Sequence, residues 1–532
     1  MKKFICVVLI LCLISGCAKG TNTDVIEGID TSGQYQENVK EQENGGSDFV
    51  ENGNSDQTSE PEPESKPEPE PEPEPTPVPE PTPNPSQNIV TADDEVSDII
   101  DLAPEQEDDG TYLPPDAVTP EYVGNVGTNA TTVEITSSNY NTVLLTLPKI
   151  NIDTLSGNEI TSRDEYVSAR ISVENVENSQ RLVPTAVEVR GRGNSTWSFF
   201  DKKPYKLRFT MKTDLLGMGA ARKWVLLANS IDDTMLRSAL AFDLAKNLGV
   251  EYVTDFRFVN VFVNGGYKGV YLLCEQTEEG STRIDVNTSK TGEADTGYVL
   301  EMWNDNVTKT DKKTFSIPYV DGILSTCRCV VVSPDEKDIN DDQLEFIKEY
   351  VRNANHAILK KDWKKINELV DIDTFVNMFL VDTVFLNNDS GYSYYMYKKA
   401  GGKLCLGPVW DIDQSAGNSS HGGAGYDGWS RGSKHDWYLA LMEIKEFREL
   451  VLKRYNEKKD YIHGLVDRVD EYATKYAYDF GMSNYIYNNF GNEKRVRTMP
   501  EIYSLKTYSE HLAYLRTWFT NRFLWIDANL KV

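Results

Sequence analysis

Residues 256–274 read FRFVNVFVNGGYKGVYLLC, and this stretch decides the fold class. Aromatic and β-branched residues, which favour strands, flank Asn264-Gly265-Gly266 on both sides. Asn-Gly pairs favour the tight turn between two neighbouring antiparallel strands. The stretch therefore predicts a β-hairpin with its turn at these three residues.

Other segments around this hairpin also alternate in the manner of strands. Residues 205–209 alternate apolar with basic side chains, so one face of that strand is expected to be buried. Similar patterns predict strands at 143–147, 150–152, 187–190, 298–302 and 329–333. A helix is predicted over residues 233–248, with Asp232 or Asp233 as its N-cap and Gly249 just past its end.

The chain becomes mainly helical after about Asp341. Apolar residues at helical spacing predict a core-facing stripe made of Trp437, Leu441, Ile444, Phe447, Val451 and Tyr455. Helices are also predicted over residues 375–386 and 504–530. Strands followed by helices predict an α+β fold in two lobes, β-rich over about 121–300 and helix-rich over about 301–532.

The N-terminus has the organisation of an export signal. Lys2 and Lys3 precede an apolar run from Phe4 to Gly16, which is too short to span a bilayer comfortably. The run ends Ile14-Ser-Gly-Cys17, similar to a bacterial lipobox, so residues 1–17 are predicted to be a lipoprotein signal peptide. Two acyl chains on Cys17 would anchor the protein stably outside the cytoplasmic membrane. The alternative is an ordinary signal peptide.

The segment after Cys17 is acidic and rich in proline. The whole chain carries 83 acidic and 55 basic residues, a net charge of −28. Residues 18–110 hold 26 of the acidic and 3 of the basic ones, and 12 of the 23 prolines lie between Pro61 and Pro85. Such composition predicts a disordered stalk over residues 18–120 that displays the remainder in or beyond the cell wall. Neither part has the basic footprint of a nucleic-acid partner.

Four cysteines lie beyond the signal peptide: Cys274, Cys327, Cys329 and Cys405. They lie in strand-like runs and form no pair of C-x-x-C motifs, so a zinc site is not supported. Buried thiols are the favoured interpretation, and one disulfide remains open in an exported protein.

The strongest candidate for chemistry lies between Leu380 and Asn418. A predicted helix ends at Asn387-Asn388-Asp389, and a predicted hairpin ends in Gly407-Pro-Val-Trp-Asp-Ile-Asp413. Carboxylates at a helix end and a hairpin end can converge, and with phosphate oxygens they suit Mg²⁺. Two alternatives stay open: these Asp residues are caps or turn residues, or they are the carboxylate pair of a glycosidase.

A second motif is weaker. Gly428-Trp-Ser-Arg-Gly432 has the letters of a hydrolase nucleophile elbow, which requires a strand before the Ser and a helix after it. A flexible, glycine-rich stretch precedes this motif, so a nucleophilic Ser430 is disfavoured.

Seven blocks, in the same order, resemble the CotH (spore-coat protein H) kinase family. The blocks are residues 190–197 (RGRGNSTW), 203–209 (KPYKLRF), 215–218 (LLGM), 224–229 (WVLLAN), 236–241 (LRSALA), 263–276 (VNGGYKGVYLLCEQ) and 407–413 (GPVWDID). The resemblance implies an atypical protein-kinase fold, with ATP and Mg²⁺ between a β-rich lobe and a helical lobe.

The resemblance also implies roles for single residues. Asp411 would bind the metal with Asp413, and Asp389 would be the catalytic Asp that orients or deprotonates a hydroxyl. The residues proposed for the cofactor are Lys206, Arg190, Arg192, Arg237 and Glu275, of which Lys206 would pair with phosphate and Glu275 would lie near the adenine. The three arginines could be phosphate or ion-pair partners, and the alternative for Lys206 and the arginines is a solvated strand face. Ser393 departs from the family, whose members often carry Asn there.

The implied function is transfer of the ATP γ-phosphate to Ser or Thr of exported or wall-associated proteins. ATP is scarce outside a cell, so a second class stays open: a catalytically inactive surface protein that acts in adhesion or assembly. The presence of both Asp389 and Asp411 favours the kinase function.

Lipid anchoring is tested by replacing Cys17 with Ser. Because the acyl chains are attached through this thiol, the variant is expected to leave the membrane fraction or to stay unprocessed. The measurement is fractionation followed by the size of the mature chain. Normal processing together with detergent-dependent membrane association of the variant would contradict the prediction.

Overall fold

The computed structural model describes residues 111–289, 292–304, 313–320, 323–387, 394–418, 425–430, 437–487, 490 and 500–531. All of these belong to one compact unit, Ala92–Val532. Cys17, Asp389, Ser393 and the predicted stalk up to residue 110 lie outside the described residues. The first described element is strand β1 (Thr111–Tyr112), which pairs with β14 (Trp429–Ser430).

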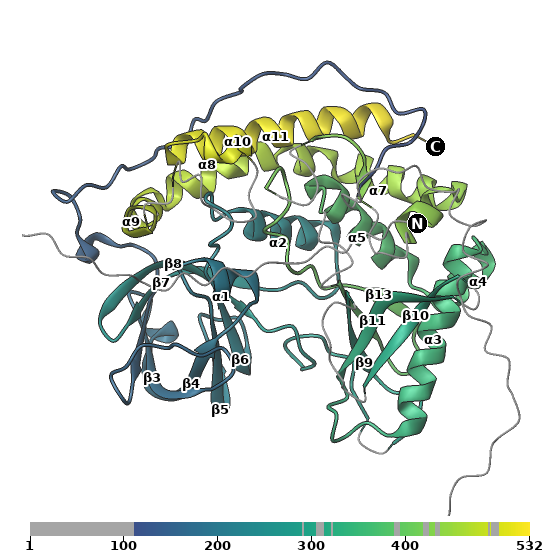
Figure 1. The fold of residues 1–532 in the computed structure, drawn as a ribbon, viewed down its shortest axis with the longest axis horizontal. Coiled ribbons are helices and arrows are strands. Elements are labelled where there is room, and N and C mark those ends of the chain that lie inside the picture. Colours follow the sequence, from purple (N-terminus) through teal and green to yellow (C-terminus); the bar gives the residue numbers. More distant parts are fainter. Residues whose placement is uncertain are drawn as a thin grey trace, which may run out of the picture. The chain divides into compact units, whose positions relative to one another are not determined.

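Seven strands close into a barrel, shown in Figure 1. They are β2 (Lys149–Thr154), β3 (Val167–Glu174), β4 (Leu182–Gly191), β5 (Tyr205–Asp214), β6 (Ala220–Leu227), β7 (Phe256–Val263) and β8 (Gly266–Glu275). The order is β2-β3-β4-β5-β6-β8-β7, and a parallel pairing of β2 with β7 closes it. The predicted hairpin is confirmed as β7 and β8. Leu207 and Val189 fill the interior, whereas Lys206 and Arg190 alternate to the outside.

A second, antiparallel sheet contains five strands in the order β10-β11-β9-β12-β13. They are β9 (Tyr298–Asn304), β10 (Thr314–Val320), β11 (Ile323–Ser333), β12 (Tyr394–Lys398) and β13 (Leu404–Leu406). The predicted mixture of strands and helices is therefore confirmed. The closed barrel was not predicted, and neither was the sheet that β12 and β13 of the mainly helical half share with β9.

The described helices complete the molecule. They are α1 (Ser195–Phe199), α2 (Arg237–Leu248), α3 (Asp341–Leu359), α4 (Trp363–Leu369), α5 (Ile372–Phe385), α6 (Trp437–Met442), α7 (Lys445–His463), α8 (Leu465–Lys475), α9 (Ala477–Tyr487), α10 (Pro500–Tyr503) and α11 (Tyr508–Asn529). The predicted apolar stripe is buried as expected, although it spans α6 and α7 rather than one helix. Among the described residues, none of these helices combines the length and apolar character needed to cross a membrane.

Two predicted elements differ from the structure. Residues 143–147 form no strand; a single 3₁₀ turn covers Thr142–Leu144, because the Asn141 side chain accepts a bond from Val143 N at 2.9 Å. Val143 is 85% exposed, so burial does not hold this segment extended. The helix predicted from residue 233 begins at Arg237, because the Asp232 carboxylate first bonds Thr234 N and closes a turn.

One buried carboxylate fixes the barrel to the helices. Asp479 of α9 is fully buried and accepts bonds from Thr146 N at 3.0 Å, Leu147 N at 3.1 Å and Asn260 Nδ2 at 2.6 Å. Its partners thus come from the segment before β2 and from β7. Because a buried carboxylate needs donors such as these, Asp479 favours one arrangement of α9 against the barrel.

Three of the four predicted thiols can be placed. Cys274, Cys329 and Cys405 are buried, as expected. The side chain of Cys327 lies outside the described residues.

Candidate functional site

Four basic side chains gather on the outer face of the barrel. Arg190 of β4 lies opposite Lys206 of β5, and Arg192 follows β4 by one residue. Lys223 of β6 lies on the same face and forms an ion pair with Glu278 at 2.8 Å. We call Arg190, Arg192, Lys206 and Lys223 the basic cluster. It unites three of the predicted cofactor-binding residues with Lys223, which the sequence did not single out.

The basic cluster carries more positive charge than the neighbouring acidic residues neutralise. Burial, and then the charges of Lys223 and Arg190, lower the pKa of Lys206 to about 8. Glu278 acts in the opposite direction but does not compensate. Among the described residues, the buried Nε of Arg190 has no hydrogen-bond partner. Such a site favours an anion with several acceptor oxygens, because an unmatched buried donor is costly.

Asp411 lies on a segment that reaches the basic cluster. The chain leaves β13 through Gly407 and Pro408, and Asp411 then adopts φ +57°, a left-handed conformation that Asp tolerates better than most residues. This turn exposes Asp411 and buries Ile412. The guanidinium of Arg192 lies over the ring of Trp410, the residue before Asp411, at 5.7 Å from the ring centre.

Tyr395 of β12 provides a second link between these elements. Burial, and then the charge and hydrogen bond of Glu301, raise its pKa well above the usual value; Arg192 opposes this shift and Asp411 adds to it. The charges of Arg192 and Asp411 therefore both act on this phenol. The structure thus brings the predicted metal ligand Asp411 to the predicted phosphate residue Arg192, although they are far apart in sequence.

Asp413 is the second predicted metal ligand. Asp413 lies two residues after Asp411 and is half-buried, and its backbone carbonyl accepts from Asn418 Nδ2 at 2.9 Å. Within the described residues, no group of three or more His, Cys, Asp or Glu could hold a metal ion. Asp411 and Asp413 offer two carboxylates, and Mg²⁺ commonly takes one or two together with waters and phosphate oxygens.

Arg237 has a different environment from the basic cluster. It is 2% exposed at the start of α2, and its Nη1 contacts Asp232 at 2.5 Å. Its Nε donates to the carbonyl of Ser415 at 3.0 Å, and its Nη2 donates to that of Ala416 at 3.0 Å. The guanidinium therefore fixes the segment that follows Asp411 to α2. We assign it a positioning role; of the phosphate and ion-pair roles that the sequence allowed for Arg237, the structure shows the ion pair with Asp232.

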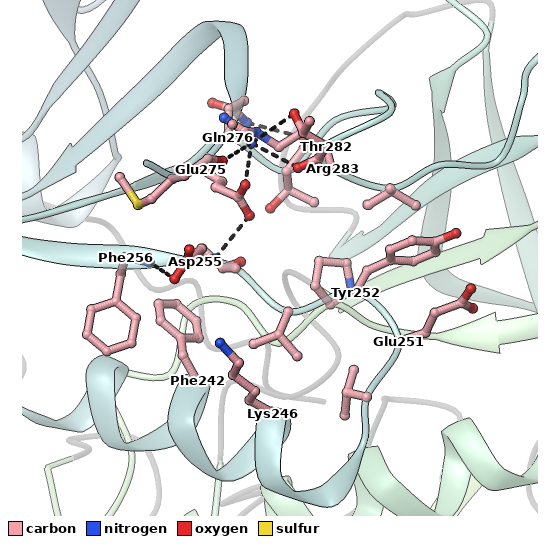
Figure 2. Close-up of a pocket in the computed structure, with 18 of the residues that line it drawn as sticks. Phe242, Lys246, Glu251, Tyr252, Asp255, Phe256, Glu275, Gln276, Thr282 and Arg283 are labelled. Atoms are coloured by element: carbon pink, nitrogen blue, oxygen red, sulfur yellow. Dashed lines mark hydrogen bonds and ion pairs between the residues drawn. The ribbon is translucent and has the colours of Figure 1, made fainter. Parts of the chain in front are cut away.

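Glu275 also lies apart from the basic cluster. Lys206, Val225 and Cys274 form one row on the outer face of the barrel, whereas Glu275 pairs in register with Trp224, whose ring lies inside. Its carboxylate forms a buried ion pair with Arg283 and accepts from Asp255 N at 3.0 Å (Figure 2). Burial raises its pKa to about 7. Its predicted place near adenine stays a prediction.

The sequence analysis missed a buried network around Asp382 of α5. This carboxylate accepts from Asn387 Nδ2 at 2.9 Å, from Tyr394 Oη at 2.8 Å and from Tyr438 Oη at 3.1 Å. Burial raises its pKa to about 6, against the effect of these donors. Asn387 and Tyr394 flank the segment that carries Asp389, so one carboxylate fixes both ends of that segment. An Asp inside an otherwise apolar helix was the signal available.

The hydrolase motif does not form a nucleophile site. Ser430 ends the short strand β14 and is fully buried, and its hydroxyl contacts the carbonyl of Asn387 at 3.3 Å. A buried hydroxyl cannot reach an external substrate, so the structure agrees with the prediction that Ser430 is not a nucleophile.

Comparison with known proteins gives one family. A family model described as CotH kinase protein matches residues 189–526, more than half of the chain. The matched region starts in β4 and includes the basic cluster, Arg237, Asp382 and Asp411. No curated protein matches the chain.

The role of Arg237 is tested by Arg237→Lys, with Arg222→Lys at an exposed position of β6 as control. Lys keeps the charge but cannot bond Asp232 and two carbonyls at once, so the free energy of unfolding should fall by about 2 kcal/mol or more. The measurement is denaturant unfolding without nucleotide. Unchanged stability combined with lost nucleotide binding would instead assign Arg237 to the cofactor.

Proposed function

The chain belongs to the CotH kinase family, and on this premise we propose that it is a Mg²⁺-dependent atypical protein kinase, lipid-anchored outside the cytoplasmic membrane. It transfers the γ-phosphate of ATP to Ser or Thr of exported or wall-associated proteins. The observation that carries the proposal is the approach of Asp411 to the basic cluster, through the contact of Arg192 with Trp410. An anion-binding cluster beside an exposed carboxylate is what metal-dependent phosphoryl transfer requires.

In this proposal the basic cluster binds the phosphates of ATP. The guanidinium groups of Arg190 and Arg192 can each offer paired N–H donors to phosphate oxygens. Lys206 adds a compact positive charge beside Arg190 and Arg192. Bound phosphates would neutralise this group of cations. The barrel would then be the β-rich lobe of a bilobal kinase fold, with ATP between it and the helical lobe.

Asp411 and Asp413 would hold the Mg²⁺. When bound, the ion supplies charge neutralisation for the phosphates and leaves its other coordination positions to water and phosphate oxygens. The chain's contribution is the exposed, left-handed Asp411, kept in place by the bonds of Arg237 to the two carbonyls that follow. The two carboxylates fit a metal that needs few protein ligands.

Asp389 would orient and deprotonate the accepting hydroxyl. The residues that flank its segment, Asn387 and Tyr394, bond the same buried carboxylate of Asp382. A general base must be held within hydrogen-bond reach of its proton, and this network supports that requirement. Cys17 and the acidic segment over 18–120 would place the kinase body among wall-associated substrates.

The roles of the two Asp residues are separated by Asp411→Ala and Asp389→Ala, with Asp153→Ala on the exposed side of β2 as control. Loss of a metal ligand should largely remove the thermal stabilisation by Mg-ATP, because that shift follows ligand affinity. Asp389→Ala should keep most of the stabilisation, while phosphate transfer drops by on the order of 10²-fold or more. The measurements are a thermal-shift titration and a labelled-ATP transfer assay.

Two outcomes would contradict this assignment. If Asp389→Ala abolished nucleotide binding and Asp411→Ala spared it, the two roles would be exchanged. If the unmodified protein showed neither Mg-dependent binding nor transfer, the adhesion or assembly function would be favoured.

The low pKa of Lys206 predicts a pH dependence of nucleotide binding. In the protein without nucleotide, the Lys206 amine has a pKa of about 8. Its positive charge is therefore present at pH 7 and is lost as the pH rises to 9. The dissociation constant for Mg-ATP should therefore increase by about tenfold between pH 7 and pH 9. The measurement is calorimetric titration at several pH values.

Lys206→Arg is the matched control for this prediction. Arg stays charged throughout this range, so the variant should lack the change in affinity between pH 7 and pH 9. An identical pH dependence in both proteins would show that another group is responsible.

A further inference from the structure

The segment that joins β2 to β3 contacts the basic cluster. The start of β3 lies beside the end of β4, because Val167 pairs in register with Val189. The residues just before β3 therefore reach Arg190 and the turn that follows β4. We call residues 162–166 the support segment. It precedes residue 189, where the match to the family model begins, so the match assigns it no role.

Two residues of the support segment bond the turn after β4. The carbonyl of Ser162 accepts from Gly191 N at 2.7 Å. Arg163 Nη1 donates to the carbonyl of Gly193 at 3.1 Å and to Asn194 Oδ1 at 2.8 Å. These bonds hold the turn on both sides of the basic-cluster residue that lies between Gly191 and Gly193.

That residue is Arg192, and the position of the turn decides where its side chain lies. Its backbone N donates to the carbonyl of Pro204 at 3.1 Å, and its guanidinium lies over the ring of Trp410, one residue before Asp411. The bonds of Arg163 therefore fix the backbone from which Arg192 reaches toward the proposed metal ligand.

Tyr166 of the support segment contacts a second arginine of the basic cluster. The guanidinium of Arg190 lies 5.1 Å from the centre of the Tyr166 ring, and that of Arg208 lies 3.9 Å from it. Arg208 is in turn paired with Glu188 at 2.7 Å. A cation over an aromatic face is attracted by the ring. The ring therefore favours one orientation of the Arg190 side chain.

The support segment is itself well anchored. Ile160, just before it, is 5% exposed and packs in the interior of the barrel. The hydroxyl of Ser162 accepts from Asp164 N at 3.1 Å and from Glu165 N at 3.0 Å, which closes a tight local turn. The side chains that reach the basic cluster thus start from a backbone held by the barrel and by this turn.

We propose that the support segment positions the phosphate-binding cations of this protein, with Arg163 and Tyr166 as positioning residues for Arg192 and Arg190. Arg163 acts on the backbone of the turn, and Tyr166 acts on the Arg190 side chain, so neither has to touch the nucleotide. Donors held in place before the ligand arrives bind it more tightly, because less freedom is lost on binding. The inference rests on the proposed function, in which both arginines bind the phosphates of ATP.

The test begins with calorimetric titration of the full chain in detergent with Mg²⁺ and a non-hydrolysable ATP analogue. Arg163→Ala removes two bonds to the turn and should weaken binding by about tenfold. Tyr166→Leu should weaken it by about two- to fivefold, whereas Tyr166→Phe keeps the ring and should restore it. Arg170→Ala, at an exposed position of β3, removes one positive charge as the control and should leave the affinity unchanged.

Hydrogen exchange without nucleotide separates positioning from a direct contact of Arg163 with phosphate. The amides of Gly191 and Ser198 donate to the carbonyls of Ser162 and Asn194 at 2.7 and 3.0 Å, so their exchange reports on the turn. Arg163→Ala should speed their exchange by about fivefold or more and leave β8 and the melting temperature unchanged. Weaker nucleotide binding with unchanged exchange would make Arg163 a phosphate ligand and overturn the proposal.

Arg190→Ala, which removes a proposed phosphate ligand, separates this inference from the proposed function. If Arg190→Ala weakens binding but Arg163→Ala and Tyr166→Leu do not, the inference fails and the proposed function stands. If the unmodified protein binds no Mg-nucleotide, both fail. If Arg163→Ala does not fold, the Tyr166 pair decides, and equal affinities of Tyr166→Leu and Tyr166→Phe overturn the inference.

Discussion

The position of Asp411 depends on one buried guanidinium. Arg237 forms an ion pair with Asp232 just before α2 and donates to two carbonyls in the segment after Asp411. Helix α2 follows the barrel strand β6 in the chain. The bonds of Arg237 therefore hold the segment of Asp411 in a fixed position relative to the barrel. The bonds of Arg237 to Ser415 and Ala416 join these two segments, and Asn418 Nδ2 adds a buried bond between them to the carbonyl of Ile231 at 3.2 Å. The arrangement proposed for phosphate and metal therefore depends on a residue that touches neither.

Two other buried carboxylates act in a similar way at other junctions. Asp479 joins α9 to the barrel, and Asp382 joins both ends of the segment that contains Asp389. Each is surrounded by several donors, as a buried carboxylate must be to avoid a large desolvation penalty. Such networks fix geometry because a displaced donor leaves a buried charge unmatched. The functional segments are thus held by directed polar contacts as well as by apolar packing.

Local patterns in the sequence predicted much of the local structure, apart from the segment 143–147 and the start of α2. The turn residues at 264–266 predicted the hairpin, and the alternation at 205–209 placed Lys206 on the outer face of its strand. The barrel was not predictable, because its closing pair joins β2 to β7 across more than a hundred residues and leaves no local pattern. The partners of Arg237 are backbone carbonyls 178 and 179 residues away, which no side-chain pattern reveals. Residue chemistry left Arg237 as either a phosphate or an ion-pair partner, and only the structure identifies Asp232 as the partner of its ion pair.

The measurement that tests the central claim most directly is incorporation of labelled phosphate from ATP by the chain that lacks its first 17 residues. With Mg²⁺ present, the account predicts incorporation on Ser or Thr of the chain itself or of an exported-protein fraction. A chelator should abolish that incorporation, because Asp411 and Asp413 would then face the phosphates without the metal that neutralises both. Absence of incorporation and of any Mg-dependent nucleotide binding, in a protein shown to be folded, would contradict the account.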